Sequence, residues 1–468
     1  MKLPDEYLAY TRVLMGESLW ADYLRALGEP PSVSIRLNRL KTLEGLRLTD
    51  ISDGQVSWCK EGHYLSHRPN FTFDPLFHAG VYYVQEAASM FLHHVLSHYV
   101  SHPVLMLDLC AAPGGKSTVA RAALPKGSLL VSNEPMRQRC QVLAENMQKW
   151  GHPDVVVTNN YPHDFRRCGV LFDVILADVP CSGEGMMRKE AEAVAQWTPS
   201  LVSQCATLQR EIVTDAWAVL KPGGYLFYST CTMNTAENEE NICYFERELG
   251  AEVLSVDVED AWNITGSLLK GWERPVCRFI PGRTRGEGLF MAVLRKGDCE
   301  MSVPKPKKQK SAPQKKSKPI EIPLVGSDDF VVVERQDRCM AVNQLWKGVL
   351  QTLDSSLNVL SAGVPLYEMK GRDLVPSHAL ALSALLKTDA FPRVELDFQQ
   401  AISYLRREAF VLPGGTPRGY VVVCFQHTPL GFMKNLGNRA NNLYPQEWRI
   451  RSTHLPDDAC PIFEQRKN

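Results

Sequence analysis

The stretch that decides the fold is VLMLDLCAAPGGKSTVARAAL, residues 104–124. It begins with an apolar run of the length of a buried β-strand and ends, from Ser117, in a helical pattern. The small residues and glycines between them let the backbone approach a ligand closely, and the helix N-terminus offers free amide donors. The stretch is neither a G-x-G-x-x-G fingerprint nor a phosphate-binding loop, which weakens a dinucleotide interpretation. It predicts a strand, a ligand-binding turn and a helix, with a plain structural connector as the alternative.

Apolar runs of the same kind recur as far as residue 296 and alternate with helical patterns. The other runs that we predict as strands are GSLLVSNE (127–134), DVVVTN (154–159), FDVILADVP (172–180), YLFYSTCT (225–232) and LFMAVLRK (289–296). Residues 135–150 and 200–220 are predicted as helices between strands. This alternation is typical of a mostly parallel sheet flanked by helices. The predicted fold class is therefore α/β, doubly wound, with ligands bound outside the carboxyl ends of the strands.

The chain of 468 residues is long enough for several domains, and its clearest boundary is VPKPKKQKSAPQKKSKP (303–319). This segment has seven lysines, four prolines and no acid, so it cannot bury enough surface to offset its ordering entropy. It is predicted as a solvated linker, and a basic arm that touches phosphates is a compatible alternative. The predicted division is an N-terminal region (1–75), a central α/β domain (76–300), the basic linker (301–319) and a C-terminal domain (320–468).

The composition excludes several classes of protein. The chain has 52 Lys and Arg residues and 52 Asp and Glu residues, so its overall charge does not indicate a nucleic-acid partner. The thirteen cysteines include no C-x-x-C pair, which argues against structural zinc and a disulfide scaffold and for reduced thiols. No apolar run is long enough to span a membrane, and the N-terminus lacks the features of a secretion signal. We therefore predict a cytoplasmic protein without a metal site.

Acidic and sulfur-bearing side chains follow the ends of several predicted strands. Glu134 closes the second strand, where an acid accepts hydrogen bonds from ribose hydroxyls in sheets of this kind; a charge at a helix N-terminus is the alternative. Cys181 follows the fourth strand, close to Asp178, and Cys231 ends the fifth. A single cysteine in an apolar strand is usually a core residue, whereas two beside an acid in one cleft favour a nucleophile. These residues predict a nucleoside-binding cleft that holds a reactive thiol.

Together, DLCAAPGGKS (108–117), DVPCSGEG (178–185) and STCT (229–232) resemble the NOL/NOP/Sun family of RNA 5-methylcytosine methyltransferases. The resemblance covers residues 37–296 and implies a Rossmann-like class I methyltransferase core that uses S-adenosylmethionine. We expect the small α+β region that precedes it, residues 1–75, to bind RNA. Further segments that carry the resemblance are RLNRLK (36–41), YYVQEAASM (82–90), MRKE (187–190), KPGGYLFYSTCT (221–232) and GEGLFMAVLRK (286–296).

The resemblance also implies the chemistry and the residues that perform it. Cys231 attacks carbon 6 of the target cytosine, which makes carbon 5 nucleophilic enough to accept a methyl group. Asp178 bonds the exocyclic amine and ring nitrogen 3, Cys181 helps to expel Cys231 afterwards, and Lys116 lies beside the cofactor and the target. The residues implied to contact S-adenosylmethionine are Cys110, Ala111, Ala112, Pro113, Gly114, Gly115, Lys116, Glu134, Asn160, Asp164 and Asp178.

Two positions depart from the pattern of this family. The family usually has an aspartate near the adenine after the third strand, where this chain has Asn159 and Asn160, with Asp164 four residues further on. The sequence leaves open whether Asn160 or Asp164 contacts the adenine. In PGRTRGEG (281–288), Gly282 stands where relatives tend to carry histidine.

The C-terminal region resembles the additional RNA-binding domain of the bacterial RsmF subgroup of that family, and the resemblance implies a PUA-like α+β fold. It rests on LVPSHALAL (374–382), AISYLRRE (401–408) and TPLGFMKNLGNRANNLYPQEWR (428–449). The implied partner is 16S rRNA near the decoding site, or the small ribosomal subunit, and we expect a monomer without membrane contact. Candidate RNA contacts, with a solvated turn-rich surface as the alternative, are Lys434, Asn435, Arg439, Asn442, Tyr444 and Arg449.

Three other functions remain as alternatives. A cysteine hydrolase needs a histidine base in the same cleft, for which His163 is the candidate, and it leaves Glu134 unexplained. A noncatalytic RNA-binding factor is disfavoured because both cysteines are present, and a transfer RNA methyltransferase shares the chemistry but not the substrate. We also expect a chain that ends near Lys296 to bind cofactor still, while its RNA affinity falls.

Overall fold

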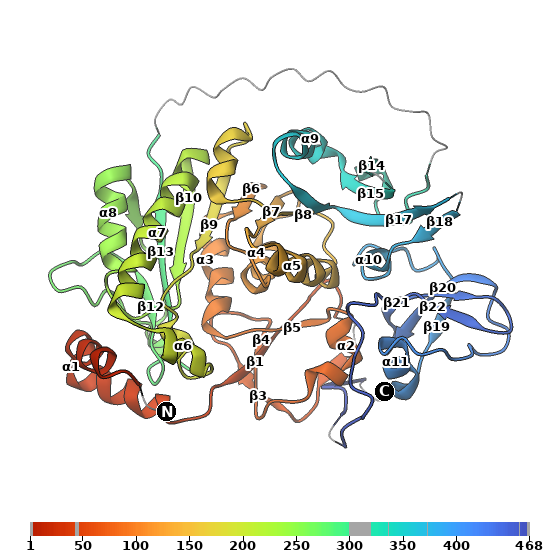
Figure 1. Ribbon diagram of the computed structural model, residues 1–468, viewed down its shortest axis with the longest axis horizontal. Coiled ribbons are helices and arrows are strands. Elements are labelled where there is room, and N and C mark those ends of the chain that lie inside the picture. Colours follow the sequence, from red (N-terminus) through yellow and green to blue (C-terminus); the bar gives the residue numbers. More distant parts are fainter. Residues whose placement is uncertain are drawn as a thin grey trace.

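The computed structural model describes residues 3–42, 46–298, 320–335, 337–371, 373–457 and 459–465 (Figure 1). The predicted basic linker, 301–319, lies outside the described residues. In the view of Figure 1 the N-terminal region lies below a central sheet, and the C-terminal region lies to its right. None of the described helices is both long and apolar enough to cross a membrane.

Nine strands of the described chain form the central sheet, whose main path runs β11-β13-β10-β9-β6-β7-β8-β16. Its parallel strands are β6 (Leu105–Asp108), β7 (Leu129–Asn133), β8 (Val155–Thr158), β9 (Phe172–Asp178) and β10 (Leu220–Thr230). β13 (Leu289–Arg295) runs antiparallel to β10 and also pairs with β11 (Glu252–Leu254) and β12 (Cys277–Phe279). All six predicted strands are present, so the α/β, doubly wound fold class is confirmed.

Alternate residues of each strand point to opposite faces, so the central sheet buries two apolar layers. Met106 packs with α3, α4 and α5 on one face, and Leu107 packs with α7 and α8 on the other. The helices are α3 (Phe91–Tyr99), α4 (Gly115–Ala123), α5 (Arg137–Trp150), α7 (Pro199–Val219) and α8 (Glu239–Leu249). The start of α7 is fixed by the Thr198 hydroxyl, which accepts the Leu201 N–H at 3.1 Å. α5 and α7 correspond to the two predicted helices.

The N-terminal region consists of α1 (Asp5–Leu27), a small antiparallel sheet in the order β3-β4-β1-β5, and α2 (Pro75–His78). The strands are β1 (Val33–Leu37), β3 (Ser52–Gln55), β4 (Gly62–Leu65) and β5 (Tyr82–Val84). In β1, Ile35 faces His63 on one side and Val84 on the other. The sheet therefore continues past the boundary predicted at residue 75, because long-range pairing rather than local composition places β5 in it.

The C-terminal region contains two four-stranded sheets in the part of the chain that is described, in the orders β14-β15-β17-β18 and β19-β20-β21-β22. The first comprises β14 (Phe330–Arg335), β15 (Arg338–Asn343), β17 (Val364–Lys370) and β18 (Asp373–Pro376). The second comprises β19 (Arg393–Glu395), β20 (Gly419–Phe425), β21 (Thr428–Asn435) and β22 (Ala440–Asn442). The helices are α9 (Lys347–Ser356), α10 (His378–Ala381) and α11 (Phe398–Leu405). The content is α+β, as expected.

Two further strands build the C-terminal region into the rest of the molecule. β16 (Val359–Ala362) pairs antiparallel with β8 and becomes the edge strand of the central sheet. β23 (Phe463–Gln465) pairs with β2 (Leu46–Leu48) of the N-terminal region. The C-terminal region therefore has structural connections to both other parts of the chain, besides the covalent one through the linker.

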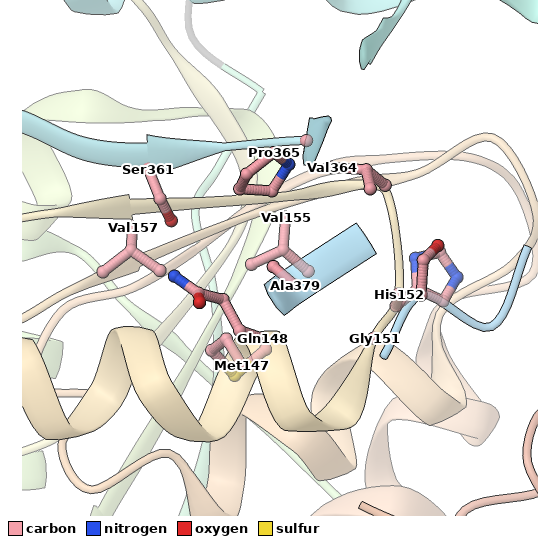
Figure 2. Close-up of a pocket in the computed structure, with 12 residues that line it drawn as sticks. Met147, Gln148, Gly151, His152, Val155, Val157, Ser361, Val364, Pro365 and Ala379 are labelled. Carbon is pink, nitrogen blue, oxygen red and sulfur yellow. The ribbon is translucent and has the colours of Figure 1, made fainter. Parts of the chain in front are cut away.

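Figure 2 shows the seam at which the C-terminal region meets the core. Met147 and Gln148 of α5 line a small cavity together with Val155 and Val157 of β8, and Ser361 of β16 lies above them. The cavity volume is about 20 Å³, far below the several hundred Å³ of ligand pockets. None of the predicted site residues lines it. The cavity therefore reflects close packing along the seam rather than a ligand site.

This packing bears on the expectation that a chain ending near Lys296 keeps its cofactor. That expectation treated the C-terminal region as separate, and the structure differs on this point. Leu353 and Val359 are 0% and 3% exposed, in one buried cluster with residues of β6, β7 and β8. A cut near Lys296 removes this part of the cluster and uncovers the edge of β8.

Leu353→Ala should destabilise the core together with the C-terminal region, by about 2–5 kcal/mol, because it leaves a cavity in their shared cluster. Urea unfolding followed by tryptophan fluorescence measures the loss. Gln351→Ala, an exposed position on the same helix, is the matched control and should change stability by less than about 0.5 kcal/mol. A loss confined to a separate minor transition, with the main midpoint unchanged, would contradict the shared core.

Candidate active site

Two loops leave the central sheet side by side at the carboxyl ends of β9 and β10. Asp178 faces Ser229 in the parallel register, so both chains leave the sheet at the same level. The loops bring Cys181 and Cys231 together, with 3.1 Å between their sulfur atoms, and both side chains are half-buried. The structure thus places in one site the two cysteines that were predicted to share a cleft.

One of the two thiols, Cys181, holds its proton tightly. The hydrogen bond to Cys231, together with burial and the charge of Cys231, holds the pKa of Cys181 well above the ordinary thiol value. Cys181 therefore keeps its proton at neutral pH. Its S–H can be donated to the Cys231 sulfur, which can stabilise negative charge there.

Lys116 and Asp178 form an ion pair in the same site. Lys116 lies in the first turn of α4, and its Nζ is 2.8 Å from Asp178 Oδ1, which also accepts a 2.6 Å bond from the Ser229 hydroxyl. Burial acts to lower the pKa of Lys116, but the Asp178 carboxylate and, to a smaller extent, Cys231 outweigh it and raise the pKa overall. The site therefore holds a fixed cation and a carboxylate next to two thiols.

A buried carboxylate, Glu184, ties the two cysteine loops to each other. It accepts the backbone N–H groups of Met233 at 2.7 Å and Asn234 at 3.0 Å. The Gly185 N–H donates to the Cys231 carbonyl oxygen at 2.7 Å, and a Cβ at this glycine would lie 2.4 Å from that oxygen. Glycine is therefore required at this close approach, and the two loops are locked in one arrangement.

A second buried carboxylate, Glu237, supports the loop that carries Cys181. It accepts the Ser182 N–H at 3.0 Å and the Ser182 hydroxyl at 2.5 Å, and the Gln209 amide donates to it at 2.7 Å. Burial raises the pKa of Glu237. Sequence reasoning assigned no role to Glu184 or Glu237; the available signal was that each acid lies within six residues of a predicted site cysteine.

The turn after β6 has the form of a binding site for a small polar ligand. Gly114 has a left-handed φ of 112° as the N-cap of α4, and Asp108 at the end of β6 is fully buried. The Ser117 hydroxyl donates to Asp108 Oδ2 at 2.7 Å, while Oδ1 has no hydrogen-bond partner in the described chain. Burial raises the pKa of Asp108 to about 7. It also raises the pKa of the Cys110 thiol in this turn, so Cys110 is not a competing nucleophile.

Glu134 follows β7 with its side chain only 1% exposed. Its Oε1 accepts the Met136 N–H at 3.0 Å, whereas Oε2 has no hydrogen-bond donor among the described residues and lies 3.6 Å from Arg139 Nη1. Buried polar atoms are nearly always hydrogen-bonded, so a carboxylate oxygen that lacks a hydrogen-bond donor can accept a hydrogen bond from a ligand hydroxyl. The residues present therefore fit the ribose of a nucleoside cofactor.

The two candidates for the adenine contact are both engaged by the protein. The Asn160 side chain accepts the Asn358 N–H at 2.9 Å and donates to the Asn358 carbonyl oxygen at 3.3 Å. Asp164 accepts the Tyr161 N–H at 2.9 Å within its own turn. His163 stacks on Tyr161, is 61% exposed, and follows β8, which β7 and β6 separate from β9. His163 is therefore not placed as the base that a cysteine hydrolase needs.

Several of the RNA contacts predicted in the C-terminal region support its fold instead. Tyr444 is 1% exposed, and its hydroxyl lies 3.2 Å from His78 Nδ1. Asn435 is also buried, and the Asn442 amide donates to a backbone carbonyl of α11. The prediction differs from the structure because polar side chains that close turns give the same sequence pattern as a polar surface. Among the candidates, Arg439 and Arg449 are exposed, and Lys434 and Asn442 are half-buried.

Comparison with known families and proteins gives consistent matches along the chain. The family of 16S rRNA methyltransferase RsmB/F matches residues 100–295, the N-terminal domain of 16S rRNA methyltransferase RsmF matches 3–87, and the RsmF PUA domain matches 391–450. Ribosomal RNA small subunit methyltransferase F from Escherichia coli O81 (strain ED1a) is 31% identical, over 95% of this chain and 96% of its own. The same enzyme from Shigella boydii serotype 18 has equal identity and coverage.

Solved structures show the same fold. NSun6 from Pyrococcus horikoshii, solved with SFG, has a TM-score of 0.52 and 20% identity, over 63% of this chain and 98% of its own. A methyltransferase homologue from the same organism has a TM-score of 0.51 and 24% identity, over 63% of this chain and all of its own. At this identity the two structures bear on the fold, and they agree with a Rossmann-like methyltransferase core.

Asp108→Asn should change how stability depends on pH. The folded pKa of Asp108 is about 7 and the ordinary value is 3.8, so between these values the unfolded chain releases a proton that the folded protein keeps. The wild type therefore loses stability as pH rises through this window, and asparagine removes that loss. Urea unfolding at several pH values should show that the free energy of unfolding of the variant rises relative to that of the wild type from about pH 4 to about pH 7. A difference that stays constant across the window would contradict the burial of an ionisable Asp108.

Proposed function

The chain belongs to the RsmF family of 16S rRNA methyltransferases, and from that premise we propose that it methylates carbon 5 of a cytosine in 16S rRNA through a covalent bond to Cys231. Membership of this family makes it an S-adenosylmethionine-dependent RNA methyltransferase. The observation that carries the finer proposal is the 3.1 Å pairing of Cys181 and Cys231 in one site with the Lys116–Asp178 ion pair.

The turn at residues 110–116 and Glu134 fit S-adenosylmethionine. Free N–H groups at the start of α4 are suited to its carboxylate, and Glu134 Oε2, which accepts no hydrogen bond from the described residues, is suited to its ribose hydroxyls. Asp178 borders the methionine end in this arrangement. When bound, S-adenosylmethionine supplies the methyl group that carbon 5 receives. The solved NSun6 structure carries SFG, an analogue of this cofactor, which supports the same assignment.

Cys231 starts the proposed reaction. Carbon 5 of cytosine is a poor nucleophile, so the thiolate of Cys231 first forms a bond to carbon 6 and pushes electrons toward carbon 5. Asp178 orients the base through its exocyclic amine and ring nitrogen 3. The Lys116 ammonium, 2.8 Å from the Asp178 carboxylate, balances the negative charge that passes onto the ring. Carbon 5 then accepts the methyl group.

Cys181 acts when the product is released. The carbon 5 proton leaves to a base, the bond between carbon 6 and sulfur breaks, and Cys231 departs as a thiolate. Cys181 keeps its own proton because its pKa is raised, so it can donate a hydrogen bond to the departing sulfur. The same contact between the two sulfur atoms thus supports both the attack and the release.

Family membership favours 16S rRNA over transfer RNA as the substrate. The curated relatives are named for the ribosomal RNA of the small subunit, and the RsmF PUA match lies in the region predicted to bind RNA. A noncatalytic role is disfavoured because it gives no reason for two thiols and an ion pair to be held in one geometry. Bisulfite sequencing of ribosomal RNA from a deletion strain identifies the modified cytosine.

The two cysteines should give opposite phenotypes when replaced. Cys231→Ala should bind RNA and cofactor but transfer no methyl group and form no adduct, because nothing attacks carbon 6. Cys181→Ala should still attack, and it should accumulate as protein joined covalently to RNA, which a denaturing gel shows as a retarded band. The double variant should lose the band.

Cys243→Ala is the matched control, because Cys243 is a half-buried thiol on α8 that lies outside the site. It should methylate normally and give no retarded band. A band that appears with Cys231→Ala and vanishes with Cys181→Ala would reverse the two assignments.

Glu134→Ala should raise the Kd for S-adenosylmethionine, because it removes the acceptor of charged hydrogen bonds worth about 1.5–3 kcal/mol, or roughly 10- to 150-fold. Glu134→Gln keeps an acceptor oxygen and should lose less. Isothermal calorimetry measures both. Wild-type affinity in the alanine variant would remove Glu134 from the cofactor site.

A further inference from the structure

Three asparagines join the C-terminal region to the loop that follows β8. The Asn159 N–H donates to the Asn358 carbonyl oxygen at 2.9 Å, and the Asn358 N–H donates to the Asn160 side-chain oxygen at 2.9 Å. The Asn160 side-chain nitrogen donates to the same Asn358 carbonyl at 3.3 Å. We call Asn159, Asn160 and Asn358 the asparagine clasp. In these three bonds the C-terminal region contributes the backbone of Asn358.

From the clasp, hydrogen bonds continue to the proposed cofactor site. The Asn159 side chain donates to the Glu134 carbonyl oxygen at 2.7 Å. Asn133 Oδ1 accepts the Asn160 N–H at 3.1 Å, and Asn133 Nδ2 donates to the Leu109 carbonyl oxygen at 3.0 Å. The peptide that carries Glu134 and the turn after β6 are therefore in one hydrogen-bond network with the clasp.

Asn358 is itself held in place by its neighbours. Leu357 and Val359 on either side are 7% and 3% exposed and pack in the cluster shared with the central sheet. Val359 faces Thr158 in the pairing of β16 with β8, and Arg335 donates to the Val359 carbonyl oxygen at 2.5 Å. Buried residues on both sides leave the Asn358 backbone little freedom to move relative to β8.

We infer that the C-terminal region positions the cofactor site through the asparagine clasp, with Asn358 as a positioning residue for S-adenosylmethionine binding. The inference rests on the proposed function, because it takes Glu134 as the ribose acceptor. It assigns the Asn160 side chain to the clasp rather than to the adenine. An aspartate at position 160 could accept the Asn358 N–H but could not donate to its carbonyl, whereas asparagine does both.

The clasp acts on the cofactor side without touching the reacting atoms. When it is lost, the loop that carries Glu134 has more conformations in the free protein, and the cofactor binds only the competent one. The effect therefore falls on cofactor affinity. The rate at saturating cofactor and RNA should change little, because Cys231, Cys181 and their supports are held from within β9, β10 and the loops that follow them.

Asn160→Ala and Asn358→Pro weaken the clasp from opposite sides. Alanine removes both bonds of the Asn160 side chain, and proline removes the N–H that Asn160 accepts, while the Asn159 N–H can still donate to the carbonyl oxygen of residue 358 in both variants. Each should raise the calorimetric Kd for S-adenosylmethionine roughly tenfold, as expected for one or two lost hydrogen bonds. The KM for the cofactor should rise in parallel, while kcat stays within about twofold. The double variant should lose no more cofactor affinity than the single variant that binds more weakly, because both substitutions act on the same connection. Asn160→Asp keeps half of the clasp and should fall between wild type and Asn160→Ala.

Asn343→Ala is the matched control. Asn343 also joins the C-terminal region to the core, donating to Asp154 Oδ1 at 3.3 Å, but it does so at the start of β8, away from the cofactor end. Its loss should leave the Kd unchanged. Hydrogen exchange of residues 133–137 without cofactor is a second readout, and it should quicken in Asn160→Ala and Asn358→Pro but not in Asn343→Ala.

If Asn160→Ala binds S-adenosylmethionine more weakly while Asn358→Pro binds it with wild-type affinity, the inference is overturned and Asn160 is assigned directly to the cofactor. An equal loss in Asn343→Ala would overturn it too, by showing a general loosening of the seam. If Asn358→Pro does not fold, Asn160→Ala must quicken exchange at residues 133–137, and unchanged exchange there refutes the clasp. Failure of the wild type to bind S-adenosylmethionine would instead contradict the proposed function, and the exchange measurement would still decide the clasp.

Discussion

The parallel register of β9 and β10 is the constraint on which the catalytic half of the molecule depends. Because Asp178 faces Ser229, the two chains leave the sheet at one level, and the cysteines that follow them meet with 3.1 Å between their sulfur atoms. Glu184 and Glu237 then hold the loops by accepting donors that would otherwise be buried unpaired. The two acids are therefore as necessary to the geometry as the thiols are to the proposed chemistry.

The cofactor half of the site takes its support from a different part of the chain. β16 completes the central sheet beyond β8, and Asn358 just before it is bonded to the loop that leads back to Glu134. A chain with the methyltransferase sheet alone thus keeps the residues of the cofactor site but loses part of what holds them. In this account the C-terminal region has a structural task at the active centre in addition to its proposed contact with RNA.

The sequence predicted what depends on local pattern and missed what depends on distant pairing. The six core strands are apolar runs with clear ends, so their positions and the site at their carboxyl ends were predictable. β16 reads only VLSA (359–362) and becomes a strand because β8 offers it an open edge. The sequence also did not predict which of these side chains are buried. Glu184 lies in a polar motif and Tyr444 lies in a turn-rich segment, yet both are 1% exposed.

Mass spectrometry of the enzyme trapped on 16S rRNA that contains 5-fluorocytidine tests whether Cys231 attacks the cytosine covalently. Fluorine at carbon 5 replaces the proton that must leave before the bond between carbon 6 and sulfur can break, so the adduct accumulates. If Cys231 attacks carbon 6, the nucleotide is found after digestion on the peptide that contains Cys231. Attachment to the peptide that contains Cys181, or no attachment in an enzyme that methylates unmodified RNA, would contradict covalent attack by Cys231.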